Sequence, residues 1–240
     1  MTPISVITSI WGRHEVVRIM AAGLKRIEAS GYALNVFAAV SNTDDEQLAV
    51  SYGWTPVRSP NFPLGNKWNN LLRYALEHSE ADYFVQTGSD DLFSARLIEA
   101  GIEAVAHGYD IAGVKDLYFV DYHSERAVKW RYNTREGCLC GAGRFISRKC
   151  AESAINSSGQ MEFWPPEAEN TLDGLSEMAA RKRGHTVKEL LFDRPQVVDV
   201  KTVGNIWNFE RFWSRNFAVP LDEALWFAGP VERKLLEDGR

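Results

Sequence analysis

The chain has 240 residues, of which 45% are hydrophobic and 25% charged, as is usual for a soluble globular protein. Its formal net charge of -5 gives no overall positive field of the kind that draws proteins to nucleic acid or anionic membranes. Its three cysteines are too few for a disulfide framework. The apolar run at residues 4–11 lacks the basic lead of a signal peptide, and no stretch approaches the ~20 apolar residues of a membrane span. We therefore expect a soluble, cytoplasmic protein.

The first half of the chain alternates predicted strands and helices. Apolar residues recur at helical spacing in the first helix, for example at Val17, Met20, Leu24 and Ile27. We expect strands at 4–10, 34–40, 54–58, 83–87 and 109–114, and helices at 14–30, 46–52, 66–76 and 97–107. This alternation predicts an α/β fold with a mixed, mostly parallel central sheet flanked by helices.

The second half is less regular. We expect strands at 117–121, 128–132, 145–147, 187–191 and 197–203, and helices at 148–155 and 175–182. Glycines at 137–143 would let the backbone approach a ligand closely. The tail is rich in aromatic residues, which we expect to form core or a homo-oligomer contact: Trp207, Phe209, Phe212, Trp213, Phe217, Trp226 and Phe227. No repeat or linker divides the chain, so we expect a single domain over residues 1–240.

Two adjacent carboxylates, Asp90 and Asp91, follow the predicted strand at 83–87. Ligands of an open α/β sheet bind at the carboxyl ends of its strands, and hard divalent cations take oxygen ligands. The pair is therefore a candidate cation site. The alternative is that the pair caps the helix that begins near Ser94, because acidic residues suit helix N-termini.

Several short motifs in chain order resemble those of the GT-A glycosyltransferases, in particular family 2, the inverting nucleotide-sugar transferases. They correspond to a first nucleotide-binding strand, a second-strand turn, a helix start, a metal motif, a glycine loop and an acidic helix segment: Ser5–Ser9, Ser41–Asp45, Gly65–Leu71, Gly88–Asp91, Gly141–Gly143 and residues 172–184. The resemblance covers roughly residues 4–185. It implies a GT-A (Rossmann-like) fold and a hexosyl- or pentosyltransferase. Residues 1–115 would bind the nucleotide sugar and 116–204 the acceptor, with 205–240 as a helical tail.

The resemblance also implies a set of site residues. Asp90 and Asp91 would hold Mn²⁺ or Mg²⁺ on the diphosphate of the donor, for which a UDP-sugar is expected. Donor contacts are expected from Thr8, Ser9, Arg13, Ser41, Lys67, Asn70, Ser89 and Asp90. Asp173 would be the general base that takes the proton of the acceptor hydroxyl. Glu167 and Glu169 are rivals for that role, and all three carboxylates also suit the start of a helix.

Other side chains leave alternatives open. Trp164 would stack on a sugar or base, or be core. Lys201 would neutralise phosphate charge, or be a solvated strand residue. Arg211 and Arg215 would meet a phosphate-bearing acceptor. The spacing of Cys138 and Cys140 does not favour a zinc site.

The sequence departs from the family pattern at three positions: Gly88 stands where an aspartate is usual, Val40 where an acidic residue reads the base, and Leu172 where a glutamate precedes Asp173. Two other functions therefore remain open: a nucleotidyltransferase, and an inactive nucleotide-binding module of the same fold. The acceptor stays open among a glycan, a small molecule, a protein, a lipid-linked glycan and a modified nucleic-acid base.

Overall fold

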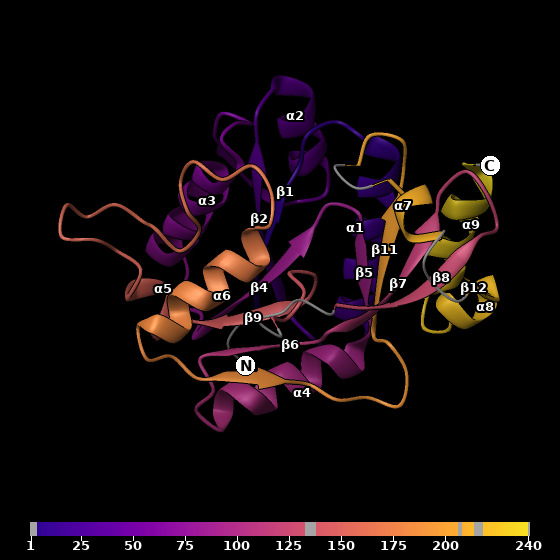
Figure 1. Ribbon diagram of the computed structural model, residues 1–240. Coiled ribbons are helices and arrows are strands. Elements are labelled where there is room, and N and C mark those ends of the chain that lie inside the picture. The colour runs from indigo at the N-terminus through magenta and orange to yellow at the C-terminus, as the bar shows by residue number, and fades with distance from the viewer. Residues whose placement is uncertain (1–3, 133–137, 206–207, 214–217, 240) are drawn as a thin grey trace.

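The computed structural model describes residues 4–132, 138–205, 208–213 and 218–239. Across these residues a seven-stranded sheet forms the centre of the molecule, in the order β10-β6-β9-β4-β1-β2-β3 (Figure 1). Its strands are β1 (Ile4–Ser9), β2 (Leu34–Val40), β3 (Thr55–Arg58), β4 (Tyr83–Gly88), β6 (Ile111–Gly113), β9 (Arg144–Ser147) and β10 (Val187–Glu189).

The sheet is mixed because one strand runs against its neighbours. β1 pairs in parallel with β2 and β4, and β2 with β3, whereas β9 is antiparallel to both β4 and β6. Residues 4–8 of β1 are all buried, as expected for a parallel strand that is covered on both faces. The predicted fold class, a mostly parallel sheet flanked by helices, is confirmed.

Helices cover both faces of this sheet. The helices are α1 (His14–Ala29), α2 (Thr43–Ser51), α3 (Leu64–His78), α4 (Ala95–Ala106), α5 (Arg148–Glu152) and α6 (Leu172–Lys182). Val6 belongs to the core that includes α1 and α4, whereas Ile7 belongs to the core that includes α3, α5 and α6. Neighbouring residues of one strand thus point into different layers.

A smaller sheet stands beside the main one, in the order β12-β8-β7-β11-β5. Its strands are β5 (Asp91–Phe93), β7 (Asp116–Asp121), β8 (Ala127–Arg131), β11 (Val197–Lys201) and β12 (Ala218–Val219). The last part of the chain adds α7 (Glu210–Trp213), α8 (Leu221–Ala224) and α9 (Pro230–Asp238). α8 packs on β7 and β8 of the smaller sheet, whereas α9 packs against α1; Ala224 and Leu236 belong to the same apolar core. Because β5 follows β4 directly, the two sheets meet next to Asp90.

Most expected elements are found, with shifts at their ends. The helix expected at 175–182 begins at Leu172, so Asp173 lies in its first turn. The short strand β5 was not expected. In the tail Phe209 and Phe212 are buried and Trp226 is half-buried, which supports their role as core. Trp207, Arg215, Phe217 and the predicted glycine at 137 lie outside the described residues.

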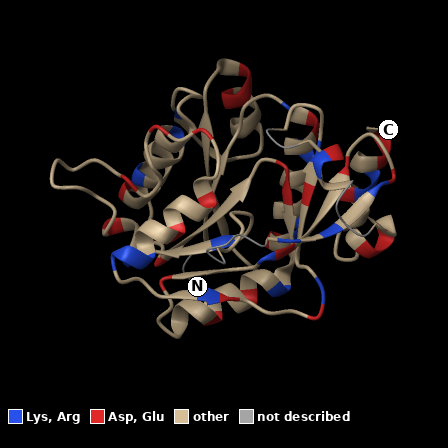
Figure 2. Cartoon of the chain, viewed as in Figure 1, with Lys and Arg blue, Asp and Glu red and all other residues tan. Residues whose placement is uncertain are grey.

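The surface carries both signs of charge. In the view of Figure 2, blue and red segments are interspersed over the described residues rather than gathered by sign. No helix in the described part of the chain combines the length and apolar character needed to cross a bilayer.

Candidate active site

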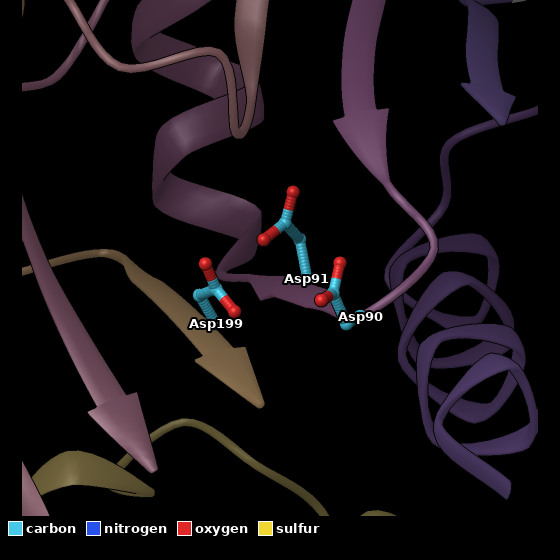
Figure 3. Close-up of side chains that lie close together, drawn as sticks. All are labelled: Asp90, Asp91 and Asp199. Atoms are coloured by element: carbon cyan, nitrogen blue, oxygen red, sulfur yellow. The ribbon is translucent and has the colours of Figure 1, made fainter. Parts of the chain in front are cut away.

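Three carboxylates gather where the two sheets meet. One oxygen each from Asp90, Asp91 and Asp199 lies within 4.8 Å of the others. Figure 3 shows Asp199 on β11 facing Asp90 and Asp91, which come from the turn after β4 and the start of β5. Across the described residues this is the only group of three or more acidic, histidine or cysteine side chains close enough to hold one metal ion.

Strand pairing builds the cluster. β5 is antiparallel to β11, and Asp91 stands directly opposite Asp199 in the register. The backbone N–H of Val200 also donates to the carbonyl of Asp90 at 2.8 Å. Like charges in opposite positions destabilise a sheet, so this pair is a feature that packing alone does not favour.

The capping alternative for Asp90 and Asp91 is wrong. Ser94 caps α4, because its hydroxyl accepts a hydrogen bond from the N–H of Leu97 at 3.2 Å. Asp91 is the first residue of β5, and the rest of that strand lies between the two aspartates and α4.

The three carboxyl groups differ in pKa. Burial raises the pKa of Asp91 well above its usual value, and the charges of Asp199 and Asp90 raise it further. Burial also raises the pKa of Asp199 to about 6, with Lys201 opposing and Asp90 reinforcing the rise. For Asp90 burial acts in the same direction, but the attraction of Arg13 and Lys201 outweighs it and lowers the pKa. Two of the three carboxyl groups therefore hold their protons more strongly than usual, because Arg13 and Lys201 do not stabilise three buried negative charges. A bound divalent cation would supply the missing positive charge.

Gly88 is part of this arrangement. A Cβ at this position would lie 2.8 Å from Oδ1 of Asp90 and 2.9 Å from Oδ2 of Asp91, closer than side chains tolerate. The Gly88 N–H donates to Oδ2 of Asp91 at 2.5 Å. The two carboxylates therefore fold back over a residue that has no side chain, and Asp199 is the third acid of the cluster.

A divalent cation fits these residues. Oδ1 of Asp199 is buried and has no hydrogen-bond partner among the described residues. Hard cations such as Mg²⁺ and Ca²⁺ bind through carboxylate oxygens, which this cluster supplies from three side chains.

Asp173 lies in the first turn of α6, half-buried. Its Oδ2 accepts a hydrogen bond from the N–H of Gly141 at 2.9 Å, and its Oδ1 accepts one from Nε2 of Gln86 at 3.3 Å. A Cβ on Gly141 would lie 2.2 Å from Oδ1 of Asp173, so the glycine allows this close contact. Both donors lie outside α6, and they orient the carboxylate away from the amides of its own helix.

One cavity of about 280 Å³ connects the two features. Asp90, Asp91 and Asp199 line it together with Asp173. Its remaining polar wall comes from Arg13, Gln86, Lys201, Asn170, Thr171 and Asn205, and its apolar wall includes Leu64, Trp68, Leu117, Phe119, Tyr132, Leu172 and Phe212.

The predicted donor contacts divide into two groups. Arg13 and Asp90 line the cavity, and Ser89 is buried behind them, where its hydroxyl accepts from Nη2 of Arg13 at 3.3 Å. The other five do not line it: Thr8, Ser9, Ser41, Lys67 and Asn70.

The structure shows why these side chains lie elsewhere. Thr8 is buried and donates to Sδ of Met20 at 3.7 Å. Lys67 is buried and donates to the carbonyl of Ile10 at 2.6 Å, and burial lowers its pKa to about 8. Asn70 is exposed on α3 and donates to Ser59 at 3.0 Å, and its donor contact stays a prediction. Ser9 and Ser41 stand at the ends of β1 and β2, and their donor contacts stay predictions.

Several open alternatives are now decided. Trp164 is fully buried against Trp68, with ring centroids 5.4 Å apart, so the core interpretation holds and the stacking one is wrong. Lys201 is buried and donates to Oδ2 of Asp199 at 2.6 Å, so it is not a solvated residue. Glu167 and Glu169 are exposed and do not line the cavity, whereas Asp173 does. Cys138 and Cys140 are buried and belong to no metal cluster among the described residues.

Sequence reasoning missed three residues of the site: Gln86, Asp199 and Asn205. Asp199, like the candidate Lys201, alternates with valine in Val197–Lys201, and this pattern places two charged side chains on one face of a strand. Gln86 is similarly a polar residue within an apolar strand. Asn205, which donates to Oδ2 of Asp90 at 2.5 Å, gives no such signal.

No protein-family profile and no curated protein sequence matches this chain. Solved structures do. Residues 1–349 of TarS from S. aureus are similar at a TM-score of 0.56 and 15% identity, over 82% of this chain and 60% of that one. The same protein in complex with UDP-GlcNAc matches at 0.56 and 18%, over 85% of this chain and 60% of that one.

The mannosyltransferase PcManGT from Pyrobaculum calidifontis, in complex with GDP-Man and Mn²⁺, matches at a TM-score of 0.56 and 13% identity, over 99% of this chain and 74% of that one. This chain has a GT-A-like glycosyltransferase fold. It spans only 60% of the TarS chain, and at these identities the likeness concerns the fold alone.

Proposed function

We propose that the protein is a glycosyltransferase that moves a sugar from a nucleotide-diphosphate donor to an acceptor hydroxyl, with inversion at the anomeric carbon. One observation carries the proposal: the carboxylate cluster and Asp173 line the same cavity. A cation site for the leaving diphosphate and a carboxylate for the acceptor proton are the two groups that this reaction needs.

The chemistry follows from the residues present. Asp173 accepts the proton of the acceptor hydroxyl while the oxygen forms a bond to the anomeric carbon. The bond between that carbon and the phosphate oxygen breaks, and its electron pair leaves with the nucleoside diphosphate. Asp90, Asp91 and Asp199 would hold a divalent cation, which supplies positive charge to the leaving oxygens. Arg13 and Lys201 add fixed positive charge in the same wall.

The proposed division of the chain fits the lining of the cavity only in part. Arg13, Gln86, Asp90 and Asp91 come from residues 1–115, which we assign to the donor. Asp173, Asp199 and Lys201 come from 116–204, assigned to the acceptor, so β11 serves the donor as well. A nucleotide sugar with a Mn²⁺ or Mg²⁺ ion is the proposed ligand, since solved structures of this fold carry UDP-GlcNAc, or GDP-Man with Mn²⁺. We keep a UDP-sugar as the expected donor.

The apolar wall of the cavity favours some kinds of acceptor over others. Rings of Trp68, Phe119, Tyr132 and Phe212 line the cavity beside its carboxylates. Aromatic rings pack well against apolar faces, and a sugar offers such a face together with hydroxyls. A glycan or a small hydroxylated molecule therefore suits this wall better than a polyanion.

The inactive-module alternative loses part of its support. It rested on Gly88 and Leu172; Asp199 completes a cluster of three carboxylates despite Gly88, whereas Leu172 still departs from the family pattern. A nucleotidyltransferase would also use such a cluster, but Asp173 would then have no acceptor hydroxyl to deprotonate.

A thermal-shift panel of nucleotide sugars and nucleoside diphosphates, with and without Mn²⁺, tests the proposal. Binding to the folded protein raises the melting temperature, and the rise grows with the logarithm of ligand concentration relative to Kd. We expect a nucleotide sugar to stabilise the protein, and Mn²⁺ to increase that shift. If no nucleoside diphosphate stabilises the protein in either condition, the proposed function is wrong.

A further inference from the structure

Arg13 has an unusual backbone. It precedes α1 with φ 50, in the left-handed region, directly after Gly12 at φ 61. Residues with a side chain adopt this region rarely, because Cβ crowds the backbone there. The Arg13 carbonyl accepts from the N–H groups of Val16 and Val17 and so starts the helix, but its side chain makes no capping bond. A glycine or asparagine would start α1 with less strain, so the arginine side chain has another role.

That side chain reaches across to the carboxylate cluster. Nη1 donates to Oδ2 of Asp90 at 2.8 Å, and Nη2 donates to the hydroxyl of Ser89 at 3.3 Å. Asn205 donates to the same Asp90 oxygen at 2.5 Å. In the free protein a positive charge of the chain itself therefore occupies an oxygen that a metal ion would use.

The second cation of the cluster is held differently. Lys201 lies two residues from Asp199 on β11, with Nζ 4.8 Å from the ring centre of Phe119 and 5.7 Å from that of Phe212. The short distance along β11 and the rings of Phe119 and Phe212 keep the Lys201 ammonium beside Asp199. The guanidinium of Arg13 stands at the end of a long side chain that lies in the cavity wall and is 23% exposed. Within the described part of the chain, no aromatic ring packs against it. Of the two cations, Arg13 is the one that can change partner.

We propose that Arg13 is an exchangeable counter-ion: it holds Asp90 in the free protein and moves to the diphosphate of the donor when a divalent cation binds the carboxylates. The proposal rests on the proposed function. Arg13 competes with the cation when no donor is present and binds the donor when one is, as a guanidinium suits both carboxylate and phosphate. Cation and nucleotide then bind with positive coupling.

The test is a pair of titrations on wild type and Arg13→Asn, because asparagine tolerates the left-handed backbone. Without nucleotide, the variant should bind Mn²⁺ more tightly, by on the order of tenfold. With saturating Mn²⁺, it should bind UDP or GDP more weakly, also by on the order of tenfold. Isothermal titration calorimetry gives both constants. Damage to the fold would weaken the binding of both ligands, so changes of opposite sign exclude that explanation.

Arg18→Gln is the matched control, because Arg18 is exposed on the same helix and lies outside the cavity wall. It should leave both constants unchanged. If Arg13→Asn weakens Mn²⁺ binding, or leaves the nucleotide constant unchanged, the exchange is overturned while the cation site stands. Two results would contradict both the proposed function and the exchange: wild type that binds no Mn²⁺ with or without nucleotide, or wild type and variants that bind no nucleoside diphosphate.

Discussion

The two ends of the cavity hold carboxylates in opposite ways. At one end Asp90, Asp91 and Asp199 crowd together, and burial raises the pKa of Asp91 and Asp199. At the other end Asp173 stands alone and is held by two neutral donors, Gly141 and Gln86. The crowded end is suited to a cation, whereas the single carboxylate is suited to a proton. Substitutions should therefore separate chemistry from cation binding.

The largest effect should come from Asp173→Asn, which removes the proposed base and keeps the shape. General base catalysis contributes roughly 10²–10⁴-fold, so kcat for transfer should fall by that range. Mn²⁺ affinity, measured by titration, should stay unchanged. Transfer at the wild-type rate would contradict the role of Asp173.

Asp199→Asn should produce the reverse pattern. It removes a proposed ligand, and because even residues behind metal ligands change affinity by roughly 10–100-fold, Mn²⁺ affinity should fall by at least about tenfold. Asparagine keeps the volume; it relieves the like-charge contact with Asp91 but removes the ion pair with Lys201, so the melting temperature of the metal-free protein should change little. A variant that binds Mn²⁺ as wild type does would exclude Asp199 from the site.

Gly88→Asp restores the acid that is usual in the family. A Cβ at this position would lie within 3.0 Å of both Asp90 and Asp91, so the added acid should displace their carboxylates. We expect weaker Mn²⁺ binding and a lower melting temperature, measured against Ser157→Asp, which adds an acid at an exposed position outside the cavity wall. Stronger Mn²⁺ binding would show that Asp199 does not replace the missing acid.

The smallest effect is a dependence of Mn²⁺ binding on pH. A carboxylate must lose its proton to bind a metal, and burial raises the pKa of Asp199 to about 6. Below that pH protons compete with Mn²⁺ for the carboxylate of Asp199. The affinity for Mn²⁺ should therefore fall by about tenfold per pH unit for each proton that the metal displaces. Titrations between pH 5 and 8 measure this slope. Asp199→Asn should reduce the slope, and an unchanged slope would exclude this group as its source.

The same comparison explains what could be predicted from the sequence. Gly88–Asp91 and Asp173 stand at the ends of local elements whose apolar patterns are plain, so both ends of the cavity could be placed. Asp199 could not, because it enters the cluster through the pairing of β11 with β5, a strand of three residues with no pattern of its own. The rotation of α3 about its axis, which turns Asn70 to solvent, could not be predicted from the sequence either.

The central claim is that a divalent cation binds between Asp90, Asp91 and Asp199 in the cavity shared with Asp173. Crystals grown with Mn²⁺ and a nucleoside diphosphate, measured near the manganese absorption edge, test it most directly. We predict one anomalous peak in contact with carboxylate oxygens of all three aspartates, with the diphosphate on the same ion. A diphosphate bound in the cavity with no such peak, or a manganese peak away from Asp199, would contradict the account.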